Sequence, residues 1–287
     1  MGDAGASDVD AQRAEMRDRW QRAASGWGRR AERLRDFGMP VSAWMIEHLS
    51  LQPGQRVLEL AAGPGDTGFL AAELVRPGGV LLTSDGSEAM LEVARERAER
   101  LGIDNVEFQR LELEWIDLPA ASVDAVLCRW GVMLIVDPAA GLREMRRVLR
   151  PGGRAALAVW DSPEVNPWAT VPTRALVTLG HVEPPDPTAP GMFALAEPGG
   201  LQEMLEEAGF VDVVVDAVRV TRPYTDVDEY IEETLDVSMP FAEAFEALSD
   251  DDRSRVRHEI AALTEPFTAP AGAVTFTGQS LVAVASA

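Results

Sequence analysis

The stretch VLELAAGPGDTGFLA, residues 57–71, contains three glycines in the pattern G-x-G-x-x-G, at Gly63, Gly65 and Gly68. The apolar run before them is typical of a buried parallel strand, and the segment after them is typical of a helix. Glycines between a strand and a helix let a ligand approach the backbone, because no Cβ blocks the way. The stretch therefore predicts an α/β fold with a nucleotide-type cofactor at this loop.

Strand-like and helix-like segments alternate through residues 56–160, and a further helix and two long strands are expected after them. This alternation predicts strand–helix–strand units with right-handed crossovers and therefore a parallel sheet. We predict a Rossmann-like, doubly wound α/β sheet, mostly parallel with an antiparallel last strand, plus a helical cap. The expected strands cover residues 56–61, 80–85, 105–111, 122–130, 154–160, 211–220 and 273–285.

Two expected helices carry clear signals at their ends. Ser87 precedes one as an N-cap and Gly102 follows it as a C-cap, while Asp137 and Pro138 open the other. Serine and aspartate accept hydrogen bonds from free amides at a helix start, proline fits the first turn, and glycine suits the left-handed residue after the end.

The remaining segments suggest a cap over the sheet. Residues 9–38 have apolar side chains at helical spacing, and a second helix is expected at 41–49. Residues 161–197 are rich in proline and aromatic residues, and long insertions of this kind are seldom neutral loops. We predict a helical cap at 1–50, a cofactor-binding core at 51–160, an inserted cap segment at 161–197, and a C-terminal part of the core at 198–287 with a helical insertion at 225–268.

Composition narrows the classes of partner. The 287 residues carry a net charge of −21, so phosphate backbones and anionic membrane surfaces repel the chain, and we expect no nucleic-acid partner. We also expect no membrane span, because no apolar run approaches the ~18 residues that a membrane helix needs. The polar, acidic first residues resemble neither a secretory signal nor a transit peptide, which predicts a cytoplasmic protein. Nothing in the sequence indicates the oligomeric state.

Missing residue types exclude several chemistries. The chain contains no lysine, because all 26 basic residues are arginine, so a P-loop lysine, a Schiff base and a Tyr-x-x-x-Lys pair are excluded. Cys128 is the single cysteine, which excludes a multi-cysteine zinc site. The three histidines lack the spacing of metal ligands, so no metal site is predicted.

Two acidic residues bear on the identity of the cofactor. Asp85 ends the second expected strand, ~20 residues after the glycines, where a carboxylate can accept hydrogen bonds from ribose hydroxyls. A dinucleotide and S-adenosylmethionine both contain a ribose that can donate these hydrogen bonds, so Asp85 does not distinguish the two cofactors. Glu59 separates them, since a carboxylate at the tip of the first strand repels a pyrophosphate but suits an ammonium and a sulfonium group.

Three stretches, at residues 57–71, 82–98 and 112–153, together resemble the class I S-adenosylmethionine-dependent methyltransferases in order and spacing. Within that class the chain is most similar to the ubiquinone/menaquinone-biosynthesis C-methyltransferases. The resemblance is good over residues 55–160 and weaker towards the C-terminus. It implies S-adenosyl-L-methionine as the cofactor and methyl transfer to a small molecule.

At the methionine end of the cofactor, the resemblance implies that Cys128 and Arg129 face the transfer site. Ala61 stands where the family has the first motif glycine, and we expect it to keep an ordinary φ. The residues implied around the methionine part are Glu59, Ala61, Gly63 and Gly65.

At the adenosine end, the resemblance implies that Asp85 binds the ribose hydroxyls. Gly86 and Met90 would line the adenine. Glu112 and Leu113 stand where the family has an Asp-Ala pair that contacts the adenine amino group. Glu112 is longer than aspartate by one methylene group.

The methyl acceptor is expected between the carboxyl ends of the fourth and fifth strands and a cap made from residues 9–38 and 161–197. Trp27, Trp130 and Trp168 are the predicted substrate-binding residues. A pocket of this kind is mostly apolar and suits a hydrophobic or aromatic acceptor, and it must exclude water from the sulfonium. No catalytic base can be identified from the sequence.

Three classes of function remain open. A small-molecule methyltransferase is favoured, and a nicotinamide-dependent oxidoreductase is disfavoured by Glu59 and the missing lysine. A non-catalytic S-adenosylmethionine-binding scaffold is the third. The identity of the cofactor in the purified protein distinguishes the oxidoreductase from the methyltransferase. Methyl transfer to any acceptor distinguishes the methyltransferase from the non-catalytic scaffold.

Overall fold

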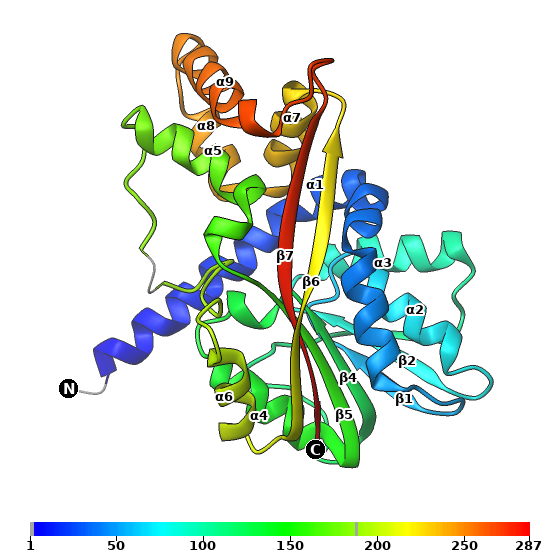
Figure 1. Cartoon of the computed structure of the whole chain (residues 1–287). Coiled ribbons are helices and arrows are strands. Elements are labelled where there is room, and N and C mark those ends of the chain that lie inside the picture. The colour runs from blue at the N-terminus through cyan, green and yellow to red at the C-terminus, as the bar shows by residue number, and fades with distance from the viewer. Residues whose placement is uncertain (1–2, 187–188) are drawn as a thin grey trace.

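The computed structural model describes residues 3–186 and 189–287, with side chains described from residue 9 onward. In this part of the chain a seven-stranded sheet has the order β3-β2-β1-β4-β5-β7-β6, and helices lie against it (Figure 1). The first five strands are parallel neighbours, whereas β7 runs antiparallel to β5 and to β6. The doubly wound, mostly parallel sheet is therefore confirmed. The strands are β1 (Arg56–Glu59), β2 (Val80–Asp85), β3 (Val106–Arg110), β4 (Val123–Arg129), β5 (Leu149–Trp160), β6 (Val211–Tyr224) and β7 (Val274–Ser286).

Strand order reverses between β1 and β4, and a ligand crevice is expected at the carboxyl ends of strands at such a point. The helix caps expected from the sequence are present. Ser87 accepts a hydrogen bond from the amide of Met90, Asp137 accepts one from Ala140, and Gly102 has a φ of 72°. The core helices are α2 (Asp66–Leu74), α3 (Glu88–Leu101), α4 (Pro138–Val148) and α6 (Gly200–Glu207), with the 3-10 turn η1 (Val132–Leu134) before α4.

The N-terminal segment differs from the prediction of two helices. A single helix, α1 (Asp3–Leu49), continues through Pro40. Proline removes a backbone donor and usually ends a helix. Here Phe37, Val41 and Met45, on either side of Pro40, are buried in the same hydrophobic core, so packing stabilises the helix across the proline.

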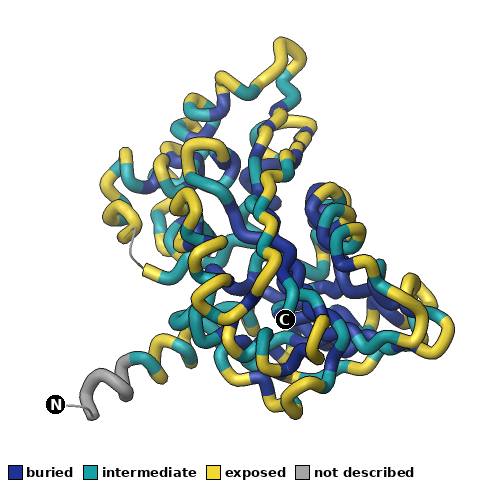
Figure 2. Tube along the Cα trace, turned by 60° about the horizontal axis from the view of Figure 1, so that its bottom comes forward, coloured by how far each residue is buried: buried dark blue, intermediate teal, exposed yellow. Residues whose placement is uncertain are grey.

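The C-terminal half completes the sheet and adds helices at one end of it. Figure 1 shows α5, α7, α8 and α9 gathered beyond one end of the two long strands β6 and β7. Figure 2 shows the buried trace following the central strands, with exposed residues on the surrounding turns and helices. These elements are η2 (Pro163–Val165), α5 (Pro167–Thr178), α7 (Val227–Val237), α8 (Met239–Glu246), α9 (Asp250–Thr264) and η3 (Glu265–Phe267).

No helix among the described residues is both long and apolar enough to cross a membrane.

Asn166, just before α5, ties the inserted segment to β7. Its Nδ2 donates to the carbonyl oxygens of Asp161, Ser162 and Gln279 at 3.0–3.1 Å. Its Oδ1 accepts hydrogen bonds from the Gln279 amide at 3.0 Å and from Trp168 Nε1 at 3.2 Å. The side chain is fully buried, so every polar atom of the amide is satisfied inside the protein.

We predict that Asn166→Ala lowers the free energy of unfolding by about 2–4 kcal/mol, because it leaves several buried donors and acceptors without partners. Denaturant unfolding followed by circular dichroism measures the change. Gln202→Ala, which removes an exposed amide bonded to Glu206, is the control and should change stability by less than about 0.5 kcal/mol. Equal effects of the two variants would contradict this role.

Candidate functional site

The loop between β1 and α2 has an alternating left-handed backbone. Ala61, Gly63 and Gly65 have φ values of 49°, 52° and 88°. The expected ordinary φ at Ala61 is therefore wrong. A Cβ on Gly65 would lie 2.5 Å from the ring of Phe69, and a Cβ on Gly131 would lie 2.4 Å from that of Ala61. Both φ and close packing thus require glycine at position 65, whereas close packing alone requires it at position 131.

Glu59 is buried below this loop. Its Oε1 accepts a hydrogen bond from the amide of Gly68 at 2.6 Å, and Thr83 Oγ1 donates to Oε2 at 3.3 Å. A Cβ on Gly68 would lie 2.1 Å from Oε2, so the third glycine of the motif makes room for a carboxylate of the chain itself. Burial raises the pKa of Glu59 to about 7, against the opposing effect of the Gly68 hydrogen bond.

Asp85 ends β2 on the other side of the loop. Its Oδ2 accepts a hydrogen bond from the Gly63 amide and its Oδ1 accepts one from the Ser87 amide, both at 2.9 Å. Burial raises the pKa of Asp85 to about 6, although these two bonds favour the ionised form. Asp85 therefore holds the glycine loop and the start of α3 in a fixed relation.

Glu112 and Leu113 follow β3 and lie next to Gly86. A Cβ on Gly86 would be 3.2 Å from Glu112 Oε2, so the two predicted adenine-side positions are neighbours. Glu112 pairs loosely with Arg17 of α1 at 3.5 Å and with Arg110 at 3.7 Å. Its carboxylate thus lies at the junction of the sheet and α1.

Helix α1 supplies one wall of the site, where the sequence predicts a helical cap with Trp27 in it. Arg13 pairs with Glu114 at 2.6 Å, and Trp27 Nε1 donates to the carbonyl of Val237 at 3.0 Å. A Cβ on Gly63 would be 3.9 Å from the Trp27 ring, so this ring lies over the glycine loop. The α1 side chains that line the pocket are Arg13, Met16, Arg17, Trp20 and Trp27.

The pocket contains about 1050 Å³ of empty space, part of it open to solvent. Of the cofactor-binding residues predicted from the resemblance, all line it except Gly65 and Cys128. Thr67, Ser87 and the segment 134–136 also line the pocket, and no sequence signal marked them as site residues.

Two predicted residues lie away from the pocket because packing buries them elsewhere. Cys128 is fully buried, and desolvation raises the pKa of its thiol to about 12, so the thiol stays protonated near neutral pH. Trp168 is 8% exposed and packs against Trp160 and Phe37 behind the site. None of the described residues of the inserted segment, 161–186 and 189–197, lines the pocket, whereas Trp27 and Trp130 do.

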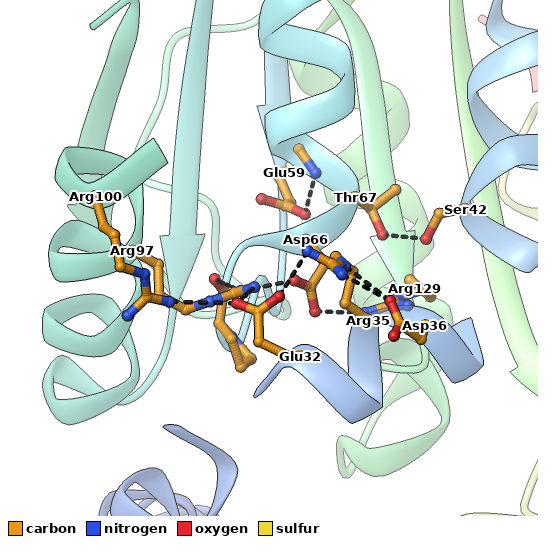
Figure 3. Close-up of polar contacts among 12 residues, drawn as sticks. Glu32, Arg35, Asp36, Ser42, Glu59, Asp66, Thr67, Arg97, Arg100 and Arg129 are labelled. Atoms are coloured by element: carbon orange, nitrogen blue, oxygen red, sulfur yellow. Dashed lines mark hydrogen bonds and ion pairs between the residues drawn. The ribbon is translucent and has the colours of Figure 1, made fainter. Parts of the chain in front are cut away.

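Figure 3 shows a buried ion network beside the pocket. Asp66, the first residue of α2, lies between two arginines, with Arg97 at 2.6 Å and Arg129 at 3.5 Å. Glu32 of α1 extends the network to Arg97 at 3.4 Å. Burial lowers the pKa of the Arg129 guanidinium, and the nearby Asp66 and Glu59 carboxylates oppose this shift. Such pairing offsets part of the cost of taking charges out of water.

The part of the chain that the structure describes contains no cluster of three or more histidine, cysteine, aspartate or glutamate side chains placed to hold a metal ion.

Comparison with known proteins bears on this site. Residues 51–182 match the model of a methyltransferase domain family. The chain is 32% identical over 127 residues to the ubiquinone/menaquinone biosynthesis C-methyltransferase UbiE of Pasteurella multocida, which covers 44% of this chain and 47% of that protein. It is 40% identical over 112 residues to the demethylmenaquinone methyltransferase of Clavibacter sepedonicus, with 39% and 44% covered. The chain thus spans about half the length of these curated relatives.

Among solved structures, the YcgJ protein from Bacillus subtilis superimposes with a TM-score of 0.56 at 20% identity, covering 85% of this chain and 97% of that one. This likeness shows a shared fold. The domain match, the similarity to the two methyltransferases and the motifs around Glu59 and Asp85 agree with one another. They show that residues 51–182 match a methyltransferase domain, and that the chain resembles the class I S-adenosylmethionine-dependent methyltransferases of ubiquinone/menaquinone biosynthesis.

Proposed function

We propose that the whole protein transfers a methyl group from S-adenosylmethionine to a small hydrophobic or aromatic molecule. The observation that carries the proposal is one pocket, at the carboxyl ends of β1, β2 and β4, which brings Glu59, Asp85 and Trp130 together. Acidic groups lie at the cofactor end of the pocket. Aromatic and aliphatic side chains, among them Trp20 and Leu134, make up much of the rest.

The proposed residue roles follow the resemblance. Asp85 accepts hydrogen bonds from the ribose hydroxyls while it keeps the Gly63 and Ser87 amides in place. Gly86, Met90, Glu112 and Leu113 surround the adenine. Around the methionine part we place Glu59, Ala61, Gly63, Gly65, Arg129 and the backbone at Cys128.

S-adenosylmethionine supplies both the methyl group and the leaving group of this reaction. The chain contributes position and the exclusion of water. Glu59 provides a negative environment for a cationic ligand, and Trp27 covers the glycine loop from α1. We do not assign Glu59 or Asp85 as a base for the acceptor, because the carboxylates of both residues already accept hydrogen bonds from backbone amides.

For the acceptor we propose a hydroxylated aromatic ring as the first candidate. The relatives named above are called ubiquinone/menaquinone biosynthesis C-methyltransferase and demethylmenaquinone methyltransferase, and both names refer to quinone compounds. An apolar wall that includes Met16, Leu134 and Ile135 favours such a ring over a polyanion.

We also propose that the four-part organisation expected from the sequence describes how the chain works. The core at 51–160 binds the cofactor, and the cap at 1–50 closes it. The inserted segment 161–197 and the residues after it support the acceptor end from behind. The net charge of −21 supports our inference that the partners are small molecules in the cytoplasm and not nucleic acids.

Our first functional prediction is that the protein forms a product that carries a labelled methyl group. The purified protein is incubated with S-adenosylmethionine carrying a radioactive methyl group and with 1,4-naphthalenediol kept reduced, and the products are separated by chromatography. We expect S-adenosylmethionine to bind with micromolar affinity, about −8 kcal/mol. NAD and NADP should not compete in calorimetry, because Glu59 repels a pyrophosphate. Tight cofactor binding without methyl transfer to any of a panel of phenols, quinols and amines would favour a non-catalytic scaffold.

A second prediction concerns the ribose contact. Asp85→Ala should weaken cofactor binding by about 1.5–3 kcal/mol, since a charged acceptor for two hydroxyls is lost. Asp85→Asn keeps one oxygen acceptor and should lose less. Isothermal titration calorimetry with S-adenosylhomocysteine measures both, and Asp104→Ala, which removes an exposed aspartate far from the pocket, is the control. Normal binding by Asp85→Ala would show that this residue does not contact the ligand.

A third prediction is a pH dependence of cofactor affinity. The pKa values of Asp85 and Glu59 are raised to about 6 and about 7, so in the free protein both carboxyls bind protons at weakly acidic pH. A sulfonium favours the ionised forms, so binding releases protons and affinity for S-adenosylmethionine rises as the pH passes through these values.

The rise should be smaller for S-adenosylhomocysteine, which lacks the sulfonium charge. In Glu59→Gln the increase in affinity near pH 7 should disappear, while the side-chain oxygen still accepts a hydrogen bond from the Gly68 amide. Calorimetry in two buffers of different ionisation enthalpy counts the released protons. An affinity that stays constant from about pH 5.5 to about pH 8 would rule out this linkage.

A further inference from the structure

Trp130, the first residue after β4, has a left-handed backbone with a φ of 59°. Side chains other than glycine adopt this conformation rarely, and it persists only where surrounding contacts determine it. The Trp130 amide donates to the carbonyl of Ala158 at 2.8 Å. Its indole Nε1 donates to Ser280 Oγ at 2.9 Å. Both ends of this residue are therefore fixed by neighbouring strands.

Ser280 is a fully buried hydroxyl on β7, far in sequence from the matched methyltransferase domain. Its Oγ donates to the carbonyl of Val159 at 2.7 Å and accepts the indole hydrogen of Trp130. The Ser280 hydroxyl thus donates its one proton and accepts a hydrogen bond with one of its lone pairs. A buried hydroxyl group needs such partners, and one of its partners here is Trp130 in the pocket wall.

The Trp130 ring is held by its neighbours within the protein. Trp160 stacks against it, with ring centroids 4.2 Å apart and an interplanar angle of 18°. The guanidinium carbon of Arg129 lies over the ring, 4.6 Å from its centroid. Phe37 also contacts the ring, and together with Trp168 it backs Trp160. Trp130 is half-buried and lines the pocket.

An aromatic ring binds favourably beside another aromatic ring, either offset-stacked or edge-to-face. Leu134 and Ile135 also line the pocket and add apolar contact.

We propose that Trp130 is the subsite for the aromatic ring of the acceptor, and that Ser280 is the positioning residue that holds it. This inference rests on the proposed function for the location of the acceptor. It goes beyond that function by assigning acceptor binding to two residues, one of them on the last strand.

The test uses the full-length protein saturated with S-adenosylhomocysteine and the probe 1,4-naphthalenediol, kept reduced and titrated by calorimetry. Trp130→Leu should weaken probe binding by more than about tenfold, because the aromatic ring is lost. Ser280→Ala should weaken it by about three- to tenfold, the range expected for one hydrogen bond. Trp115→Phe, at a 76% exposed tryptophan, is the control and should leave it unchanged. Binding of S-adenosylhomocysteine should stay within about twofold in all variants, which also reports correct folding.

A double-mutant cycle separates positioning from general stability. Trp130→Phe removes the indole donor, so adding Ser280→Ala to it should cause no further loss of probe binding. In wild-type protein the Trp130 indole hydrogen, assigned in NMR spectra by its absence in Trp130→Phe, should exchange slowly with solvent. In Ser280→Ala this exchange should become fast while the other indole hydrogens stay unchanged.

The outcomes are distinguishable from those of the proposed function. Probe binding that depends on Trp130 and Ser280, without any methyl transfer, supports the subsite and contradicts the proposed reaction. Absent probe binding to wild-type protein overturns the subsite. Binding that is equally tight in Trp130→Leu, or losses that are additive in the double variant, overturns it as well, even if methyl transfer is observed.

Discussion

The carboxylate of Glu59 lies buried between β1, β2 and α2, and the amide of Gly68 donates to it at 2.6 Å. An isolated carboxylate in such a place would be costly, so the surrounding chain must supply donors and leave space. That requirement explains glycine at position 68, where a Cβ would meet the carboxylate. It also fixes the start of α2 relative to the strand tip, and the left-handed turns of the loop between them follow from this short connection. The remaining site residues take their positions from this loop.

Asp85 and Asp66 extend the same arrangement outward. Asp85 bonds the glycine loop to the start of α3, and Asp66 lies between Arg97 and Arg129. Glu32 connects this network to α1, so the helix that walls the pocket is attached to the core through charged groups as well as through apolar packing. The absence of lysine suits this design, because the planar guanidinium can bridge two acceptors at once.

The sequence predicted the features that depend on local signals. The strands, the caps at Ser87 and Asp137, and the sheet with its antiparallel last strand agree with the structure because periodicity and capping chemistry act over a few residues. Glu59 and Asp85 could be found because a motif places them at strand ends. Their bonds to the chain's own amides could not, since these depend on the loop geometry.

Features set by distant packing were not predictable. Helix α1 continues through Pro40 because residues on both sides of the proline enter one core. The side of α1 that covers the pocket is chosen by contacts such as Arg13 with Glu114, whose positions in the chain are far apart. Trp168 was expected in the site from composition alone, but its ring packs behind Trp160, and no local pattern distinguishes these two environments.

The Trp130–Ser280 hydrogen bond has a consequence for the order in which the site assembles. Contacts at the glycine loop join residues 9 and 22 positions apart, whereas this bond joins residues 150 positions apart. Closing a long loop costs more chain entropy than closing a short one. The contacts that hold the two ends of the pocket therefore differ in how far apart in the sequence their residues lie. During synthesis the loop around Gly63 can form early, while the wall at Trp130 must wait for β7.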